Sequence, residues 1–177
     1  AAGNTLEALI GAALVVRFAG GCDAFATARG VLGFTLFGGL CAPAVSATIG
    51  VAALWLCGST ELALAPGIWL TWWTGDASGA LVAAPLLVLL LRPVEREELA
   101  PRPGPVESAA LLVAALGVAL LVFHGRGAPL HFLLLPVLTW AAFRFSSLTC
   151  SLLTVMFVGI AVAATVARRG PFGAHEP

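Results

Sequence analysis

The stretch from Val31 to Cys57 contains no charged side chain, and it is long enough to cross a lipid bilayer as one helix. The hydrocarbon core of a bilayer is about 30 Å thick, and an α-helix crosses it in about 20 mostly apolar residues. A second run, from Gly67 to Leu91, is interrupted only by Asp76. Because backbone groups in lipid must be bonded within the chain, such runs predict membrane-spanning helices.

Charged residues are too few to cover a soluble domain of this size. The chain has nine basic and nine acidic side chains among 177 residues, 60% of its residues are hydrophobic, and its mean hydropathy is +1.02. Soluble domains are about 45–50% apolar and about 25% charged. The sequence therefore predicts an all-α fold, a polytopic transmembrane helix bundle whose solvent is the lipid bilayer. No basic face is offered to nucleic acid.

Five segments are long and apolar enough to span the membrane, and a sixth is doubtful. The five are about Thr5–Phe18, Val31–Cys57, Gly67–Leu91, Val106–Phe123 and Leu148–Ala167. The sixth, Leu130–Phe143, is shorter and contains Pro136, so it either crosses tilted or enters and turns back. We expect these five to six segments to form one bundle over residues 1–167. Residues 168–177 are expected to be a tail or the start of a linker to an absent output domain.

Arginine residues indicate the orientation, because connections rich in arginine stay cytoplasmic. Arg17 and Arg29 flank the first connection, and the charged segment Arg92–Pro105 forms the third. Both connections are expected on the cytoplasmic side. The pair Arg168–Arg169 favours a cytoplasmic C-terminus as well, which requires an odd number of crossings. This count favours a re-entrant Leu130–Phe143.

Small residues predict where helices approach one another, since helix pairing in lipid depends on close backbone contact. In the second span they recur every four residues, at Gly38, Ala42, Ser46 and Gly50. A neighbouring helix is expected to dock along this stripe. In the third span, Gly75 and Gly79 form a GxxxG motif, which in apolar, glycine-rich sequence arises by packing or by chance with similar frequency.

The third span contains the most informative polar group. Trp69, Trp72, Trp73 and Asp76 have the i, i+3, i+4, i+7 spacing that places side chains on one helical face. A belt of indoles at the membrane interface explains Trp69 and Trp72. It does not explain Asp76, because an ionised carboxylate inside a span costs on the order of 2.5–3.5 kcal/mol. Arg144, set between two apolar stretches, is its expected partner.

Asn4 and Glu7 lie three residues apart and share a face of the first helix. If the helix continues upstream, both side chains are within the membrane and face the bundle interior. If the helix begins here, they are a solvated N-terminal cap. We favour burial and add both residues to the candidate polar network or sensing site formed by Trp69, Trp72, Trp73, Asp76 and Arg144.

No catalytic motif or metal site is predicted. The sequence contains no GxSxG, HExxH or Walker loop. The four cysteines show no ligand spacing, and we interpret them as small apolar residues. His124 and His131 bracket a GRGAP turn and are interpreted as surface histidines rather than ligands. We expect no enzyme activity, no cofactor and no metal.

Four segments resemble one known family. They are GNTLEALIGA, APAVSATIGVAALWL, WLTWWTGDASGALVAAPLLVLL and FLLLPVLTWAAFRFSS, and Trp72, Trp73, Gly75 and Asp76 form the most specific element. Together they resemble the first type of membrane-associated sensor domain, a bacterial family of multi-span input modules. The ending RRGPF is similar to the family's exit toward a downstream domain. Members begin with further spans, including a WPPAG-type segment, so this chain is expected to be an N-terminally truncated fragment.

The resemblance implies a sensory input domain in the bacterial inner membrane. Such a domain passes its signal to a cytoplasmic output domain, which is a histidine kinase of a two-component system or an enzyme that makes or degrades cyclic diguanylate. The partners implied are that output domain and a second copy in a homodimer. Two other functions remain open. Broken helices and intramembrane charge also mark a transporter subunit or small-solute permease, and a purely structural anchor would need no site at all.

Overall fold

A computed structural model describes residues 2–91, 103–124 and 130–167. These parts contain helices and turns and no strand. The chain divides into two compact units, Ala1–Val88 and Leu89–Pro177. Most of the charged third connection, the pair Arg168–Arg169 and the predicted tail lie outside the described residues.

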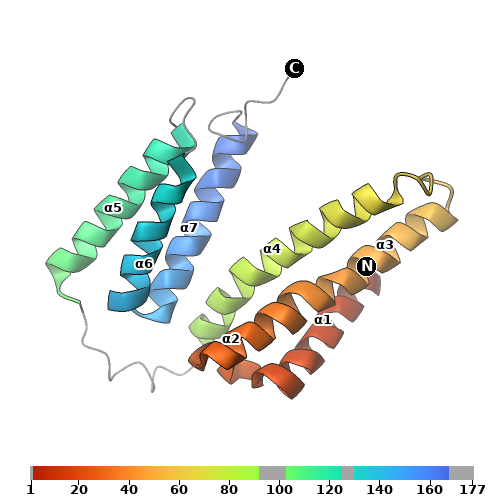
Figure 1. The fold of residues 1–177 in the computed structure, drawn as a ribbon, viewed down its shortest axis with the longest axis horizontal. Helices are drawn as coiled ribbons and strands as arrows, with labels where there is room; N and C mark the ends of the chain where they lie inside the picture. The colour runs from red at the N-terminus through yellow and green to blue at the C-terminus, as the bar shows by residue number, and fades with distance from the viewer. Residues whose placement is uncertain (1, 92–102, 125–129, 168–177) are drawn as a thin grey trace. The chain divides into compact units, whose positions relative to one another are not determined.

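The first unit consists of three long helical segments (Figure 1). The first joins α1 (Ala2–Leu14) to the π-helical turn η1 (Val15–Ala19). The second joins α2 (Ala28–Phe34), the π-helical segment η3 (Thr35–Cys41) and α3 (Ala42–Leu56). The third is α4 (Ala65–Leu91). All three are apolar and long enough to cross a membrane, as the sequence predicts.

Two glycines and one threonine determine the conformation of the connection between the first and second helical segments. Gly20 and Gly21 have φ angles of 89° and 62°, in the left-handed region that residues with a Cβ avoid, and they end the first segment. The 3₁₀ turn η2 (Gly21–Ala26) follows. Thr27 is then the N-cap of α2, and its hydroxyl accepts a hydrogen bond from the Gly30 amide at 3.1 Å. The cap therefore determines that the second helical segment begins at Ala28.

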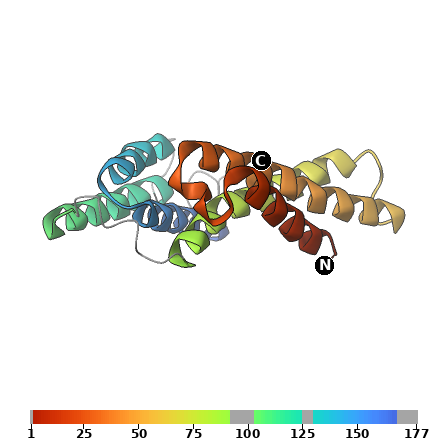
Figure 2. The ribbon, with the colours of Figure 1, turned by 90° about the horizontal axis from the view of Figure 1, so that it is seen from below.

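Small residues let α1 lie directly on α3 (Figures 1 and 2). A Cβ at Gly3 would be 3.4 Å from the Cα of Ser46, and one at Gly11 would be 3.0 Å from the Cβ of Ala42. Glycine at these positions is what permits the close approach. Three members of the small-residue stripe, Gly38, Ala42 and Ser46, thus face the first helical segment, while the fourth, Gly50, faces α4.

The GxxxG motif of α4 has no such role within the described residues. A Cβ at Gly75 or Gly79 would meet nothing within 4 Å. The helix contacts its neighbour instead through Leu81, which lies over Gly39, and Trp72, which lies over Gly50. Large side chains from α4 therefore fit onto glycines of η3 and α3.

The second unit is a three-helix arrangement of α5 (Pro105–His124), α6 (Leu134–Arg144) and α7 (Ser147–Val166). A short 3₁₀ turn, η5 (Leu130–Leu133), leads into α6. The core contains one face of α5 and facing residues of the other two helices: Leu111, Ala115, Ala119, Val122, Val137, Ala141, Leu153 and Phe157. Spacings of three and four residues along α5 give that single buried face.

The doubtful segment, Leu130–Phe143, forms η5 and α6 and is shorter than the five helices that are long enough to span a membrane. Figure 1 shows α6 running antiparallel to both α5 and α7, and it contacts each of them. The chain therefore passes through the unit three times in alternating directions. Pro136 does not interrupt α6 because it lies in the first turn, where backbone N–H groups have no helical acceptor.

The alternation gives α5 and α7 the same direction. The start of α5 and the end of α7 therefore lie at opposite ends of the unit. The expected cytoplasmic positions of the third connection and of Arg168–Arg169 concern residues that lie mostly outside the described ones, and they stay predictions.

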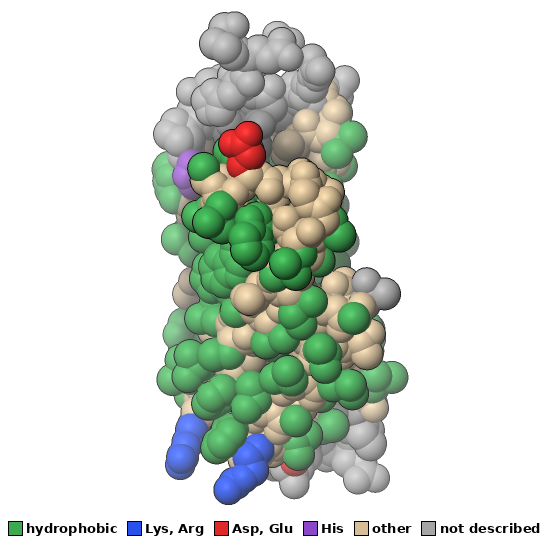
Figure 3. All heavy atoms as spheres, turned by 90° about the vertical axis from the view of Figure 1, so that its right-hand side faces the viewer, with side chains coloured by type: hydrophobic (Ala, Val, Ile, Leu, Met, Phe, Trp, Pro, Cys, Tyr) green, Lys and Arg blue, Asp and Glu red, His purple; other side chains and the backbone are tan. Residues whose placement is uncertain are grey.

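Apolar side chains cover most of the face shown in Figure 3, and cationic side chains lie at one end of it. Many large hydrophobic residues are exposed, among them Leu9, Leu32, Leu87, Val113 and Phe143. In water such a surface would aggregate, whereas lipid is a favourable environment for it. The described surface is thus that of an integral membrane protein.

Replacing Gly30 with alanine is expected to destabilise the first unit, because the new Cβ would overlap the backbone carbonyl of Ala24. Forced overpacking of this kind costs about 1–3 kcal/mol. The matched control is Gly79→Ala, where the Cβ meets open space and stability should be unchanged or slightly increased. Thermal unfolding in detergent measures both. Equal unfolding temperatures for the two variants would contradict the contact between α2 and η2.

Single cysteines introduced at Gly104 and Ala167, in a protein whose native cysteines are replaced by alanine, should label from opposite sides of the membrane. A membrane-impermeant maleimide added to intact cells should modify one of the two cysteines and leave the other unmodified until the cells are broken. Labelling of both positions from the same side would show that α6 does not cross.

Candidate functional site

One face of α4 carries the residues that tie it to the second helical segment. The Trp69 indole donates a hydrogen bond to Thr48 Oγ1 at 3.0 Å, and the Trp73 indole donates to the Leu40 carbonyl at 2.9 Å. The two indoles are stacked, with centroids 5.6 Å apart. Two tryptophans thus connect α4 to both α3 and η3, a role beyond that of an interfacial belt.

Asp76 lies one turn further along the same face. Its Oδ2 accepts a hydrogen bond from the Ser46 hydroxyl at 3.0 Å, which joins α4 to α3. The helix has 27 residues and is about 40 Å long, and Asp76 is about 16 Å from its start. The carboxyl group is therefore near the middle of the span, too far along the helix for the side chain to reach the membrane surface.

Ser46 has a single hydroxyl proton and two acceptors within reach. Besides Asp76, its hydroxyl is 3.0 Å from the carbonyl of Pro43 in the preceding turn. That carbonyl also receives the helical N–H of residue 47, so it is not left unpaired when the proton goes to Asp76. Only 5% of Ser46 is exposed, and its bond to the carboxylate is the stronger one when Asp76 is ionised.

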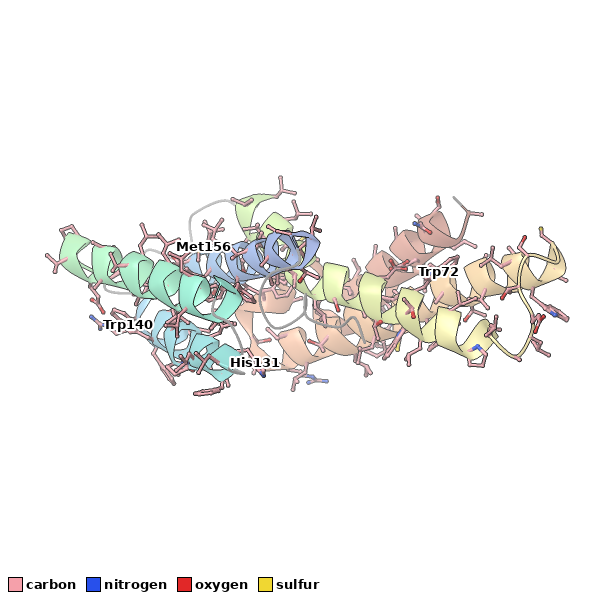
Figure 4. All side chains as sticks on the ribbon, turned by 90° about the horizontal axis from the view of Figure 1, so that it is seen from above. Trp72, His131, Trp140 and Met156 are labelled. Atoms are coloured by element: carbon pink, nitrogen blue, oxygen red, sulfur yellow. The ribbon has the colours of Figure 1, made fainter. Side chains whose placement is uncertain are left out.

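A pocket of about 400 Å³ opens beside this pair, between α1, α3 and α4. Its polar lining consists of Asn4, Ser46 and Asp76, and one wall is the ring of Trp72, which is labelled in Figure 4. The remaining lining residues are small or aliphatic: Ala2, Gly3, Ile49, Gly50 and Ala53. Each of the three helices thus contributes a polar group to one cavity.

Three of the seven predicted site residues, Asn4, Trp72 and Asp76, line this pocket. Trp69 and Trp73 lie beside it on the same face of α4, and Glu7 is half-buried one turn after Asn4. The sequence analysis named Ser46 and Gly50 only as packing residues. Their small size was the visible signal, whereas the partner of each depends on the rotation of α4.

The expected pairing of Asp76 with Arg144 is wrong. Arg144 binds Glu107 through two hydrogen bonds, of 2.8 Å from Nε and 2.9 Å from Nη2, within the second unit. Glu107 is in the first turn of α5, 37 positions away along the chain, so no local sequence pattern connects the two. The pair joins the start of α5 to the end of α6.

Two π-helical turns occur in the first unit, η1 and η3, and they contact each other. Such wide turns are uncommon and often occur at functional sites. The Trp73 hydrogen bond reaches the carbonyl of Leu40, which belongs to η3. The face of α4 that carries Asp76 is therefore physically connected to the irregular part of the second segment.

No group of three or more histidine, cysteine, aspartate or glutamate side chains gathers at metal-binding distance among residues 2–91, 103–124 and 130–167. The polar groups of the pocket are one carboxylate, one amide and one hydroxyl. This set can hold a ligand by hydrogen bonds and charge.

The helices and the polar pocket between them define a multi-span membrane protein with an intramembrane site. Its sequence matches the model of the MASE1 family over residues 1–176, so the chain belongs to the MASE1 family, whose members are membrane-associated sensory domains found in signalling proteins. The resemblance drawn from the WWxGD element is thereby confirmed. No curated protein and no solved structure matches the chain.

Replacing Trp73 with phenylalanine should loosen the attachment of α4, because the ring is largely kept while the bond to Leu40 is lost. The expected destabilisation is about 0.5–1.5 kcal/mol, the net value of one hydrogen bond. Trp55→Phe is the control, since that indole is 49% exposed near the end of α3. Denaturant titration in mixed micelles gives the comparison, and equal stability of the two variants would contradict the link.

Proposed function

We propose that this domain detects a small ligand or a membrane state at the pocket between α1, α3 and α4. The observation that carries the proposal is the hydrogen bond between Ser46 and Asp76 beside a cavity near the middle of the span. A carboxyl group in this place is costly, and intramembrane ionisable residues are functional sites by default. A sensory family supplies the matching context.

Binding at the pocket would favour one of two arrangements of α4 against the second helical segment. Asp76 and Trp72 contact the cavity, and Trp73, on the adjacent turn, binds η3. A shift of α4 would therefore reach the π-helical turns, whose wider spacing offers an alternative hydrogen-bond register. Such a two-state element is what allows a small local change to become a movement of whole helices.

In this proposal the domain lies in the bacterial inner membrane and has no catalysis of its own. It acts as a homodimer and regulates a cytoplasmic output domain, either a histidine kinase or an enzyme of cyclic diguanylate turnover. Support comes from the sensory family to which the chain belongs.

The test introduces Asp76→Asn and Ser46→Ala separately into the whole gene product and measures its output activity across growth conditions. Asp76→Asn removes the negative charge of the pair, and Ser46→Ala removes its hydrogen-bond donor. Each variant should change the regulated output about fivefold or more, which is the size of a typical allosteric effect.

Matched controls exist for both substitutions. Asp23→Asn changes a carboxylate in the first connection, and Ser78→Ala changes a hydroxyl that bonds to its own helix at the carbonyl of Thr74. Both controls should regulate normally. If Asp76→Asn folds and signals as the wild type does under every condition, the pocket is not the sensing site.

A further inference from the structure

We propose that the pocket binds a primary ammonium group carried on a small apolar body. The inference rests on the proposed function, because it names the ligand class of the same pocket. Its basis is the carboxyl group of Asp76, the other acceptors that line the pocket and the indole ring of Trp72.

Asp76 lacks a cationic partner among residues 2–88 of the first unit. The described cations there are Arg17 and Arg29, which flank the first connection. Arg29 precedes Ser46 on the same helical segment by about 25 Å along the axis, and the guanidinium of Arg17 lies over the Phe18 ring at 5.3 Å. An ionised carboxylate at this depth needs a counter-charge, and the pocket beside it is where a ligand can supply one.

The polar lining matches an ammonium group with three N–H donors. The pocket presents the Asp76 carboxylate, the Ser46 hydroxyl oxygen and the Asn4 amide, which offers a carbonyl oxygen. A primary ammonium has three N–H donors, which equals the number of these acceptor groups. A quaternary ammonium has no donor and relies on several aromatic rings, whereas Trp72 is the single ring in the lining.

The remaining lining residues favour a ligand whose ammonium group is attached to an apolar group. Gly50 has no side chain, so the Trp72 ring lies against α3 and forms a flat wall, with Ile49 and Ala53 beside it. A volume of about 400 Å³ is in the range of small-molecule sites. The ligand is therefore an amphipathic amine rather than a bare cation, since a hydrated ion would leave the indole wall unused.

The experiment uses the protein as encoded, in lipid nanodiscs, with phenethylammonium and its neutral isostere 2-phenylethanol as probes. Phenethylammonium should raise the unfolding temperature of the wild type and of Asp23→Asn with a saturable dose dependence. 2-Phenylethanol should give only the unsaturable effect of partition into lipid. Binding to Asp76→Asn should be at least about tenfold weaker, because a charge-assisted hydrogen bond is lost.

Asn4→Ala provides a second variant at an exposed residue of α1, in case Asp76→Asn does not fold, and it should weaken binding severalfold. Equal saturable binding of the alcohol, undiminished binding to both variants, or no saturable binding of phenethylammonium would each overturn the inference. If the amine fails to bind while Asp76→Asn alters output, the sensory role stands and the ligand class is wrong. If the amine binds while output is unaffected, the sensory role of the pocket is wrong.

Discussion

Every polar group in this protein that lies within the hydrocarbon must find a partner inside the chain, because lipid offers none. Asp76 is the severest case, and Ser46 is the partner that the fold provides. The indole N–H groups of Trp69 and Trp73 obey the same constraint by bonding to Thr48 and Leu40. These three bonds join α4 to the second helical segment, so the requirement that polar groups be paired also determines which face of α4 turns inward.

The two interfaces of the first unit use opposite solutions to packing in lipid. Between α1 and α3, small residues face small residues, and the backbones come close. Between α3 and α4, large side chains bridge a wider gap, as Trp72 does over Gly50 and Leu81 does over Gly39. A wide interface beside a close one leaves space between the three helices. The pocket occupies that space, and it takes its polar character from Asn4, Ser46 and Asp76.

The sequence predicted the helical class and the five long spans, because uncharged runs of this length have one stable form in lipid. It also identified the face of α4 that carries Asp76, since helical spacing alone decides that. It failed where the answer depends on distant contacts. Glu107 lies 37 positions from Arg144 along the chain, so no local spacing rule pairs the two. Gly75 and Gly79 matched a packing motif, but in the described residues the contacts of the helix are made by Trp72 and Leu81.

The segment η3 contains wider turns than an α-helix, so the chain should tolerate the loss of one residue there. A π turn accommodates one residue more than an α turn while the helices on either side keep their directions. Shortening Thr35–Cys41 by a single residue could therefore restore an ordinary helical ladder and leave α3 and its stripe of small residues facing α1. Related chains that differ here by a one-residue gap would thus share the same helix faces on both sides of it.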